Sequence, residues 1–294
     1  MPYRYNVIIN FKQDWISRLK KELESYGYIV KETGDDICFS YFNLRKRLIQ
    51  PIPRKVMISN QFKCPKEFKK ALNLLKDKIE KGENIYPYLS KRILNLSYHD
   101  DLLNDWGIYH LHLGTEIDKN TKFIKRTAPL LFARFDEGHA YFINIYKHGA
   151  WTKQKMIRIL HENWPESIGQ FRMKEIESVT PKLTDKQYAM LRKSHVTTIV
   201  EVEKGVVYFP IGMGYMSSGH SMEVIRLCEH YSNVLYDYEK HIKDNIVAIV
   251  KLIKDRGGNI SNKLHFHLWL EKNKIFAYEL YSNSKIELGT FFNE

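Results

Sequence analysis

Two histidines that stand two residues apart mark the segment of the chain best suited to chemistry. His110 and His112 fall within 108–113, where an alternating pattern predicts a strand. Alternate side chains of a strand point to one face, so the two imidazoles would lie about 7 Å apart on the same surface. Such a pair can transfer protons or ligate a metal ion. The alternative is a half-exposed strand whose histidines have no chemical role.

The next predicted hairpin adds basic side chains to the same surface. Its strands, at 130–135 and 140–147, flank the turn at 136–138, and His148 follows them. Cleavage of RNA without a metal needs a base for the 2′-hydroxyl, an acid for the leaving oxygen and cations for the phosphorane. We therefore expect an active site made of His110, His112, Arg134 and His148. The residues expected to bind substrate are Tyr109, Lys147, Lys153, Arg45, Lys46 and Arg47.

A glycine-rich loop before a predicted helix is a candidate anion site. It contains Gly212, Gly214, Ser218 and Gly219, and backbone amides in such a loop can bind a phosphate. Its spacing fits neither the dinucleotide fingerprint nor the P-loop. Ser218 or Ser221 serves equally well as a plain helix cap.

A second pair of histidines suggests a metal site as an alternative. His265 and His267 would share one strand face, and with His110 and His112 they would offer four imidazoles. Imidazole suits divalent transition metals such as zinc, nickel or copper. In the competing interpretation the second pair faces water while Phe266 and its apolar neighbours face the core. We favour no cofactor and keep a divalent transition metal as the alternative.

The charge of the chain places the first histidine pair in a basic environment. The 294 residues include 46 Lys+Arg and 34 Asp+Glu, giving a formal charge of +12. Residues 1–174 carry the whole excess, and residues 175–294 hold 15 charges of each sign. A basic field attracts polyanions such as nucleic acid, although a lysine-rich composition also produces such an excess by chance. Cys38, Cys64 and Cys228 are scattered, and the chain shows neither a signal peptide nor a membrane span. These features predict a cytoplasmic protein with no membrane partner.

Hydrophobic periodicity predicts the elements that position these residues. Besides the strands above, strands are expected at 5–11, 37–42, 54–59, 171–179, 197–202, 206–210, 264–270 and 275–281. Helices are expected at 14–26, 65–82, 85–96, 152–163 and 184–193, with one long helix over 221–256. The fold class is α+β with mostly antiparallel sheets. We expect two domains: a basic one over 1–174, which includes a small α/β element at 1–60, and a neutral one over 175–294 built on the long helix.

In residues 65–163, two predicted helices precede a three-stranded antiparallel run. The strands of this run have the sequences Asp105-Trp-Gly-Ile-Tyr-His-Leu-His-Leu, Leu130-Leu-Phe-Ala-Arg-Phe-Asp and Ala140-Tyr-Phe-Ile-Asn-Ile-Tyr-Lys-His-Gly-Ala-Trp-Thr-Lys. This arrangement resembles the RelE/ParE-type toxins. In that family such residues bind and cut messenger RNA. The resemblance implies that Arg134 stabilises the phosphate and that His148 or a nearby lysine handles protons. The chain departs from the family in its greater length and in a longer insertion at 115–127.

These observations favour a metal-independent endoribonuclease of toxin or phage-defence type, with RNA as its partner and an inhibitor or antitoxin protein as a further one. A non-catalytic protein that binds nucleic acid or another partner is the alternative, and a histidine-rich, metal-dependent hydrolase is the second alternative. The apolar stripe of the long helix would pack on its own domain, or on a second copy in a homodimer.

Overall fold

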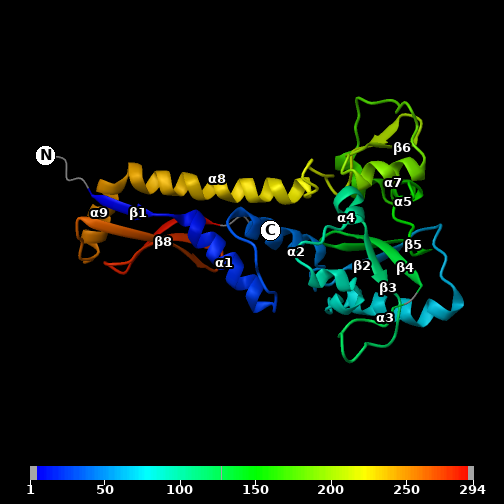
Figure 1. Ribbon diagram of the computed structural model, residues 1–294, viewed down its shortest axis with the longest axis horizontal. Coiled ribbons are helices and arrows are strands. Elements are labelled where there is room, and N and C mark those ends of the chain that lie inside the picture. Colours follow the sequence, from blue (N-terminus) through cyan, green and yellow to red (C-terminus); the bar gives the residue numbers. More distant parts are fainter. Residues whose placement is uncertain (1–4, 127, 291–294) are drawn as a thin grey trace. The chain divides into compact units, whose positions relative to one another are not determined.

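The computed structural model describes residues 5–126 and 128–290, and it divides the chain into two compact units (Figure 1). Residues 42–225 form one unit, here called the central unit. The described residues before and after it, 5–41 and 226–290, form the terminal unit. None of the helices in the described residues is both long enough and apolar enough to cross a membrane.

The terminal unit is built on a four-stranded sheet. Its strands lie in the order β1 (Asn6–Ile9), β8 (Lys263–Glu271), β9 (Lys274–Glu279) and β10 (Ser284–Thr290). β1 runs parallel to β8, and the other neighbours are antiparallel. Helices α1 (Phe11–Ser25) and α9 (Ile246–Asp255) and part of α8 (Met222–Asp244) pack on one face of the sheet, where Leu264, Phe266 and Ala277 are buried. The first and last parts of the described chain therefore share one core.

Helices α2 (Asp35–Arg47) and α8 belong to both units. The strand predicted at 37–42 is wrong, because this segment is part of α2. Two carboxylates in its first turn suit the positive end of a helix, and Ile37, Cys38 and Tyr41 are buried at helical spacing. The predicted long helix is present as α8 followed directly by α9, with Asn245 between the two.

The central unit holds a second four-stranded sheet, in the order β2 (Lys55–Ile58), β5 (His139–Lys147), β4 (Pro129–Phe135) and β3 (Tyr109–His112). β2 is parallel to β5, whereas β5, β4 and β3 form an antiparallel run. A small hairpin, β6 (Val200–Glu203) and β7 (Val206–Tyr208), completes the strands of this unit. Five of the seven strand pairings among the described residues are antiparallel, so the predicted α+β class with mostly antiparallel sheets is confirmed.

The helices of the central unit are short. They are α3 (Lys69–Glu80), α4 (Asp101–Trp106), α5 (Lys155–Asn163), α6 (Pro165–Ile168) and α7 (Asp185–Lys193), with single 3₁₀ turns η1 (Lys66–Phe68), η2 (Tyr86–Tyr88), η3 (Lys91–Leu94) and η4 (Gly169–Phe171). The helix predicted at 85–96 is replaced by η2 and η3, because Pro87 and the cap Ser90 each start a separate turn. The strand predicted at 171–179 is absent, and only Arg172 forms a single bridge there.

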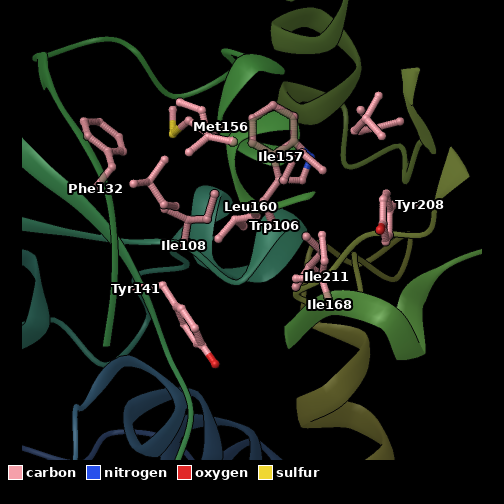
Figure 2. Close-up of a cluster of buried hydrophobic side chains, with 14 of the residues drawn as sticks. Trp106, Ile108, Phe132, Tyr141, Met156, Ile157, Leu160, Ile168, Tyr208 and Ile211 are labelled. Atoms are coloured by element: carbon pink, nitrogen blue, oxygen red, sulfur yellow. The ribbon is translucent and has the colours of Figure 1, made fainter. Parts of the chain in front are cut away.

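One hydrophobic core joins the sheet of the central unit to its later segments. Figure 2 shows Trp106, Ile108 and Phe132 in the same cluster as Tyr208 and Ile211. Residues on both sides of position 174 are thus buried together, so the chain does not divide at 174 and 175 as predicted. The central unit instead continues to residue 225.

The net charge differs strongly between the central unit and the rest of the chain. Residues 42–225 hold 30 Lys+Arg against 19 Asp+Glu, a formal charge of +11. Residues 1–41 and 226–294 together hold 16 Lys+Arg against 15 Asp+Glu, a formal charge of +1. Nearly all of the basic excess therefore belongs to the central unit.

Candidate active site

A cavity of about 500 Å³ in the central unit brings together three of the four predicted active-site residues. His110 and His112 line it from β3, and His148 lines it from the turn after β5. Three exposed cations, Arg92, Arg126 and Lys193, lie on its wall as well. Ligand cavities commonly measure roughly 300–1,000 Å³, so this one can hold a group the size of a nucleotide.

The turn from α4 into β3 sets His110 against a carboxylate. α4 ends at Gly107, whose positive φ of 62° reverses the chain into β3. Asp100 caps the start of α4, with its Oδ1 accepting a hydrogen bond from the Leu103 N–H at 3.1 Å. Its Oδ2 lies 3.6 Å from Nδ1 of His110, and both side chains are largely buried. Asp100 therefore supplies a negative charge beside this imidazole, and the sequence prediction missed it.

His112 is held in its neutral form. Burial, and next the positive charge that His110, Arg126 and His148 can carry nearby, lowers its pKa from 6.5 to about 4. Its Nδ1 is buried and has no hydrogen-bond partner among the described residues. A buried imidazole that is unprotonated at neutral pH can accept a proton from a substrate.

Trp151 separates two of the histidines. Its ring centroid lies 4.8 Å from that of His110 and 4.9 Å from that of His148. The backbone carbonyl of Trp151 accepts a hydrogen bond from Nη1 of Arg192, a residue of α7. Trp151 thus fixes the spacing of the two imidazoles, and Arg192 fixes Trp151.

Arg192, which lines the cavity, also forms a buried ion pair. Its Nη2 lies 2.7 Å from Oδ2 of Asp105, and its guanidinium stacks on the ring of Trp106 at 4.3 Å. Burial raises the pKa of Asp105, and the charge of Arg192 opposes that rise. Because both charges are almost fully buried, removal of either one leaves the other without compensation.

His99 is a fourth histidine on the cavity wall that the sequence prediction missed. Its ring meets that of His220 edge-on, with centroids 4.9 Å apart, and its Nδ1 is buried without a hydrogen-bond partner among the described residues. Burial, and next His220, lowers its pKa. The only sequence signal for it was its place in the run His99-Asp100-Asp101, which leads into α4.

Two predicted site residues on the same strands lie away from the cavity. The guanidinium of Arg134 donates hydrogen bonds to the carbonyls of Ser167, at 3.0 Å, and Phe135, at 3.3 Å, and Arg134 is not among the lining residues. The hydroxyl of Tyr109 donates to the carbonyl of Lys46 at 2.7 Å, and burial raises the pKa of this phenol. Both side chains stabilise the fold where they stand.

The basic cluster on α2 is mostly turned inward. Lys46 donates to the Gly212 carbonyl and the Ser221 hydroxyl at 2.9 Å each, and forms an ion pair of 2.5 Å with Glu223. Arg47 is buried and donates to backbone carbonyls of the η3 region, including that of Asn95 at 3.0 Å. Arg45, the third member, is half-buried. By contrast, Lys147 and Lys153 are exposed beside the turn that carries His148.

The glycine-rich loop packs tightly against α4. The amides of Gly212 and Gly214 donate to the carbonyls of Asp105 and Asn104 at 2.9 Å each, and that of Gly219 donates within the loop at 2.8 Å. A Cβ atom at Gly212 would lie 2.1 Å from a backbone oxygen of α4. The hydroxyl of Ser218 and Nδ1 of His220 share a hydrogen bond of 3.1 Å. These glycines are explained by close packing, and the three amides are already occupied.

The second histidine pair belongs to the terminal unit. The rings of His265 and His267 lie 4.3 Å apart on β8, and Nδ1 of His267 lies 3.3 Å from a carboxylate oxygen of Asp14. His110 and His112 belong to the central unit. Among the residues that the structure describes, no group of three or more His, Cys, Asp or Glu side chains has an arrangement that could hold a metal ion.

The fold and the cavity define a two-unit α+β protein with a basic, histidine-lined pocket. Comparison with known proteins adds no relative: no protein family, curated protein or solved structure is significantly similar to the chain.

Proposed function

We propose that this protein is a cytoplasmic endoribonuclease that cleaves RNA by metal-independent acid–base catalysis. The observation that carries the proposal is the convergence of His110, His112 and His148 in one cavity of the basic central unit. The three cysteines are free thiols, which suits a reducing compartment. The resemblance to RelE/ParE-type toxins supports RNA as the substrate.

The proposed reaction uses the two β3 histidines in different roles. His112, neutral at physiological pH, accepts the proton of a ribose 2′-hydroxyl, and the 2′-oxygen attacks the adjacent phosphorus. The bond from phosphorus to the 5′-oxygen breaks, and His110 donates a proton to that leaving oxygen. The carboxylate of Asp100 lies 3.6 Å from Nδ1 of His110, so a negative charge stands beside the proton donor. The products are a 2′,3′-cyclic phosphate and a free 5′-hydroxyl.

The charge that develops on the phosphorane is met by the cations of the cavity wall. Arg92, Arg126 and Lys193 have exposed side chains that line the cavity, and His148 stands beside them. Positive groups fixed around a developing anion lower the barrier more than mobile water does. These residues replace Arg134, whose guanidinium is bound to backbone carbonyls instead.

The proposal is tested by incubating the purified protein with end-labelled RNA in EDTA. We expect cleavage with 2′,3′-cyclic phosphate ends, no cleavage of the 2′-deoxy analogue, and a loss of at least 100-fold in H110Q and in H112Q. H139Q is the matched control, since His139 is half-exposed at the start of β5 and does not line the cavity. Wild-type protein that leaves every RNA intact refutes the nuclease assignment.

The same assay separates the two alternative functions. RNA binding without cleavage, unchanged in H110Q and H148Q, would identify a non-catalytic binding protein. Cleavage that EDTA abolishes, together with about one transition-metal ion per chain by elemental analysis, would identify the metal-dependent hydrolase.

A further inference from the structure

The segment that follows β2 is fastened along the strand that leads to the cavity. β2 runs parallel to β5, and the chain after it continues in the same direction. The side chain of Asn144 on β5 holds this segment twice: its Oδ1 accepts from the Lys63 N–H at 3.0 Å, and its Nδ2 donates to the Gln61 carbonyl at 3.1 Å. The Ser59 hydroxyl donates to the Ile143 carbonyl at 2.7 Å. Residues 59–63 are therefore fixed relative to β5.

The distance from this segment to the cavity is short. Lys147 follows Asn144 by three residues, which is about 10 Å along a strand. His148, on the cavity wall, is the next residue. Lys153 lies beside them, with its Nζ 5.0 Å from the ring centroid of Tyr146 on β5. Exposed lysines thus lie between the cavity and Lys63.

Beyond Lys63 the chain places three more lysines at the start of α3. Lys63, Lys66, Lys69 and Lys70 are all exposed, and none forms an ion pair within the described residues. Glu67 is the single acidic residue in 63–70. At the other end of the helix Lys76 pairs with Glu80 at 3.6 Å and Lys78 with Glu83 at 2.5 Å, which leaves only Lys81, at the C-cap, unpaired among the described lysines there. The unpaired positive charge is therefore concentrated at the end of α3 that is anchored to β5.

Helix stability does not explain this placement. The N-terminal end of a helix carries partial positive charge and favours acidic side chains, yet the first turn of α3 has none. Packing does not explain it either, because the buried face of α3 consists of Ala71, Leu72, Leu75 and Ile79. Unpaired lysines at the positive end of a helix are suited to an anionic partner.

We infer that Lys63, Lys66, Lys69 and Lys70, here called the α3 lysine surface, bind the phosphate backbone of a single-stranded RNA whose reactive phosphate occupies the histidine-lined cavity. This inference rests on the proposed function. Lys147 and Lys153 bridge the two sites. Lysine contacts to phosphate carry no base specificity, so the surface sets affinity and position rather than sequence choice.

The test measures the binding of a fluorescent 2′-deoxy oligonucleotide, which cannot be cleaved by 2′-oxygen attack, to the full chain at several salt concentrations. Each lysine–phosphate contact on a single strand contributes about 0.7 to the slope of log affinity against log salt. The variant K63Q/K66Q/K69Q/K70Q is expected to lower the slope by about 2–3 and to weaken binding at 0.1 M salt on the order of 100-fold.

A matched control removes four exposed lysines of the terminal unit. K240Q/K251Q/K254Q/K263Q changes the net charge equally, and its slope is expected to stay within about 0.5 of the wild type. Equal slopes in the two variants overturn the inference, as does tighter binding of polyglutamate than of the oligonucleotide, which would identify an acidic protein as the partner.

Cleavage assays distinguish failure of this inference from failure of the proposed function. With a dinucleotide, which reaches only the cavity, the α3 variant is expected to keep the wild-type kcat and KM, whereas with a long RNA its KM rises. Cleavage by both proteins with unchanged KM for long RNA refutes the α3 lysine surface alone. If the α3 variant lowers the salt slope as expected but the wild type cleaves no RNA, the nuclease assignment is refuted and the assignment of the α3 lysine surface is retained.

Discussion

His112 makes the stability of the protein depend on acidity in a way that can be calculated. Its pKa is about 4 in the folded chain, against 6.5 for an unperturbed imidazole. Between these two values the unfolded state binds the proton and the folded state does not, so stability falls as the pH is lowered through this range. The full effect of the shift is about 3 kcal/mol, at 1.36 kcal/mol for each pH unit between the two values. Above pH 6.5 the effect vanishes.

The assay compares urea unfolding of the wild type and of H112Q at pH 7.0 and pH 4.5. Glutamine keeps a polar side chain of similar reach but does not titrate. The wild type is expected to lose about 2 kcal/mol more than the variant between the two pH values. All other titrating groups are shared, so the difference reports His112 alone. Equal losses in both proteins, or an NMR titration of the His112 ring with a midpoint near 6.5, refute the argument that burial holds this imidazole neutral.

Three further predictions concern the groups around the cavity. R192A is expected to lower the free energy of unfolding by about 3–5 kcal/mol, since it leaves the buried Asp105 carboxylate unpaired; chemical denaturation measures this, and a change below about 1 kcal/mol contradicts it. D100N keeps a residue able to cap α4, so its free energy of unfolding should change by less than about 0.5 kcal/mol. Its turnover of RNA is expected to fall about tenfold or more, because the charge beside His110 is lost. Equal turnover in both proteins would remove Asp100 from the mechanism. G212A is expected to destabilise the protein by about 3 kcal/mol because its Cβ overlaps a carbonyl of α4; an unchanged melting temperature would contradict the packing role of this glycine.

Local patterns predicted the antiparallel run of the central unit well. The alternation around His110 and His112, the turn at 136–138 and the cap of α7 by Thr184 are all decided by neighbouring residues. The strand predicted at 37–42 failed because a short apolar run satisfies both a buried strand and a buried helix face. The predicted domain boundary at 174 and 175 was wrong for another reason. Asn6 pairs with Lys263, and the residues around each carry no signal of a partner so distant in the sequence.

In the candidate site, too, local patterns predicted the residues on the strands but not those that approach from distant elements. His110, His112 and His148 meet because β3, β4 and β5 pair in the register that alternation implies, with His112 opposite Leu130 at the end nearest His148. Arg134 shares that face but lies four residues along β4 from Leu130, about 13 Å away at the other end of the strand. Tyr109 lies on the opposite face from its neighbour His110.

The groups that the prediction missed enter the site from other elements. Asp100 and His99 stand before α4, and Arg192 comes from α7, so their approach depends on tertiary packing. A strand pattern contains no information about that packing.

The interrupted terminal unit determines the order in which the protein can be assembled on the ribosome. β1 is synthesised first, but the strand that completes its pairing, β8, follows only after the whole central unit. Because domains fold as units during synthesis, the central unit closes its sheet and forms its cavity while β1 and α1 still have no strand to join. We therefore expect a nascent chain whose central unit has left the ribosome before β8 is made to carry the folded histidine-lined cavity while β1 is still unpaired.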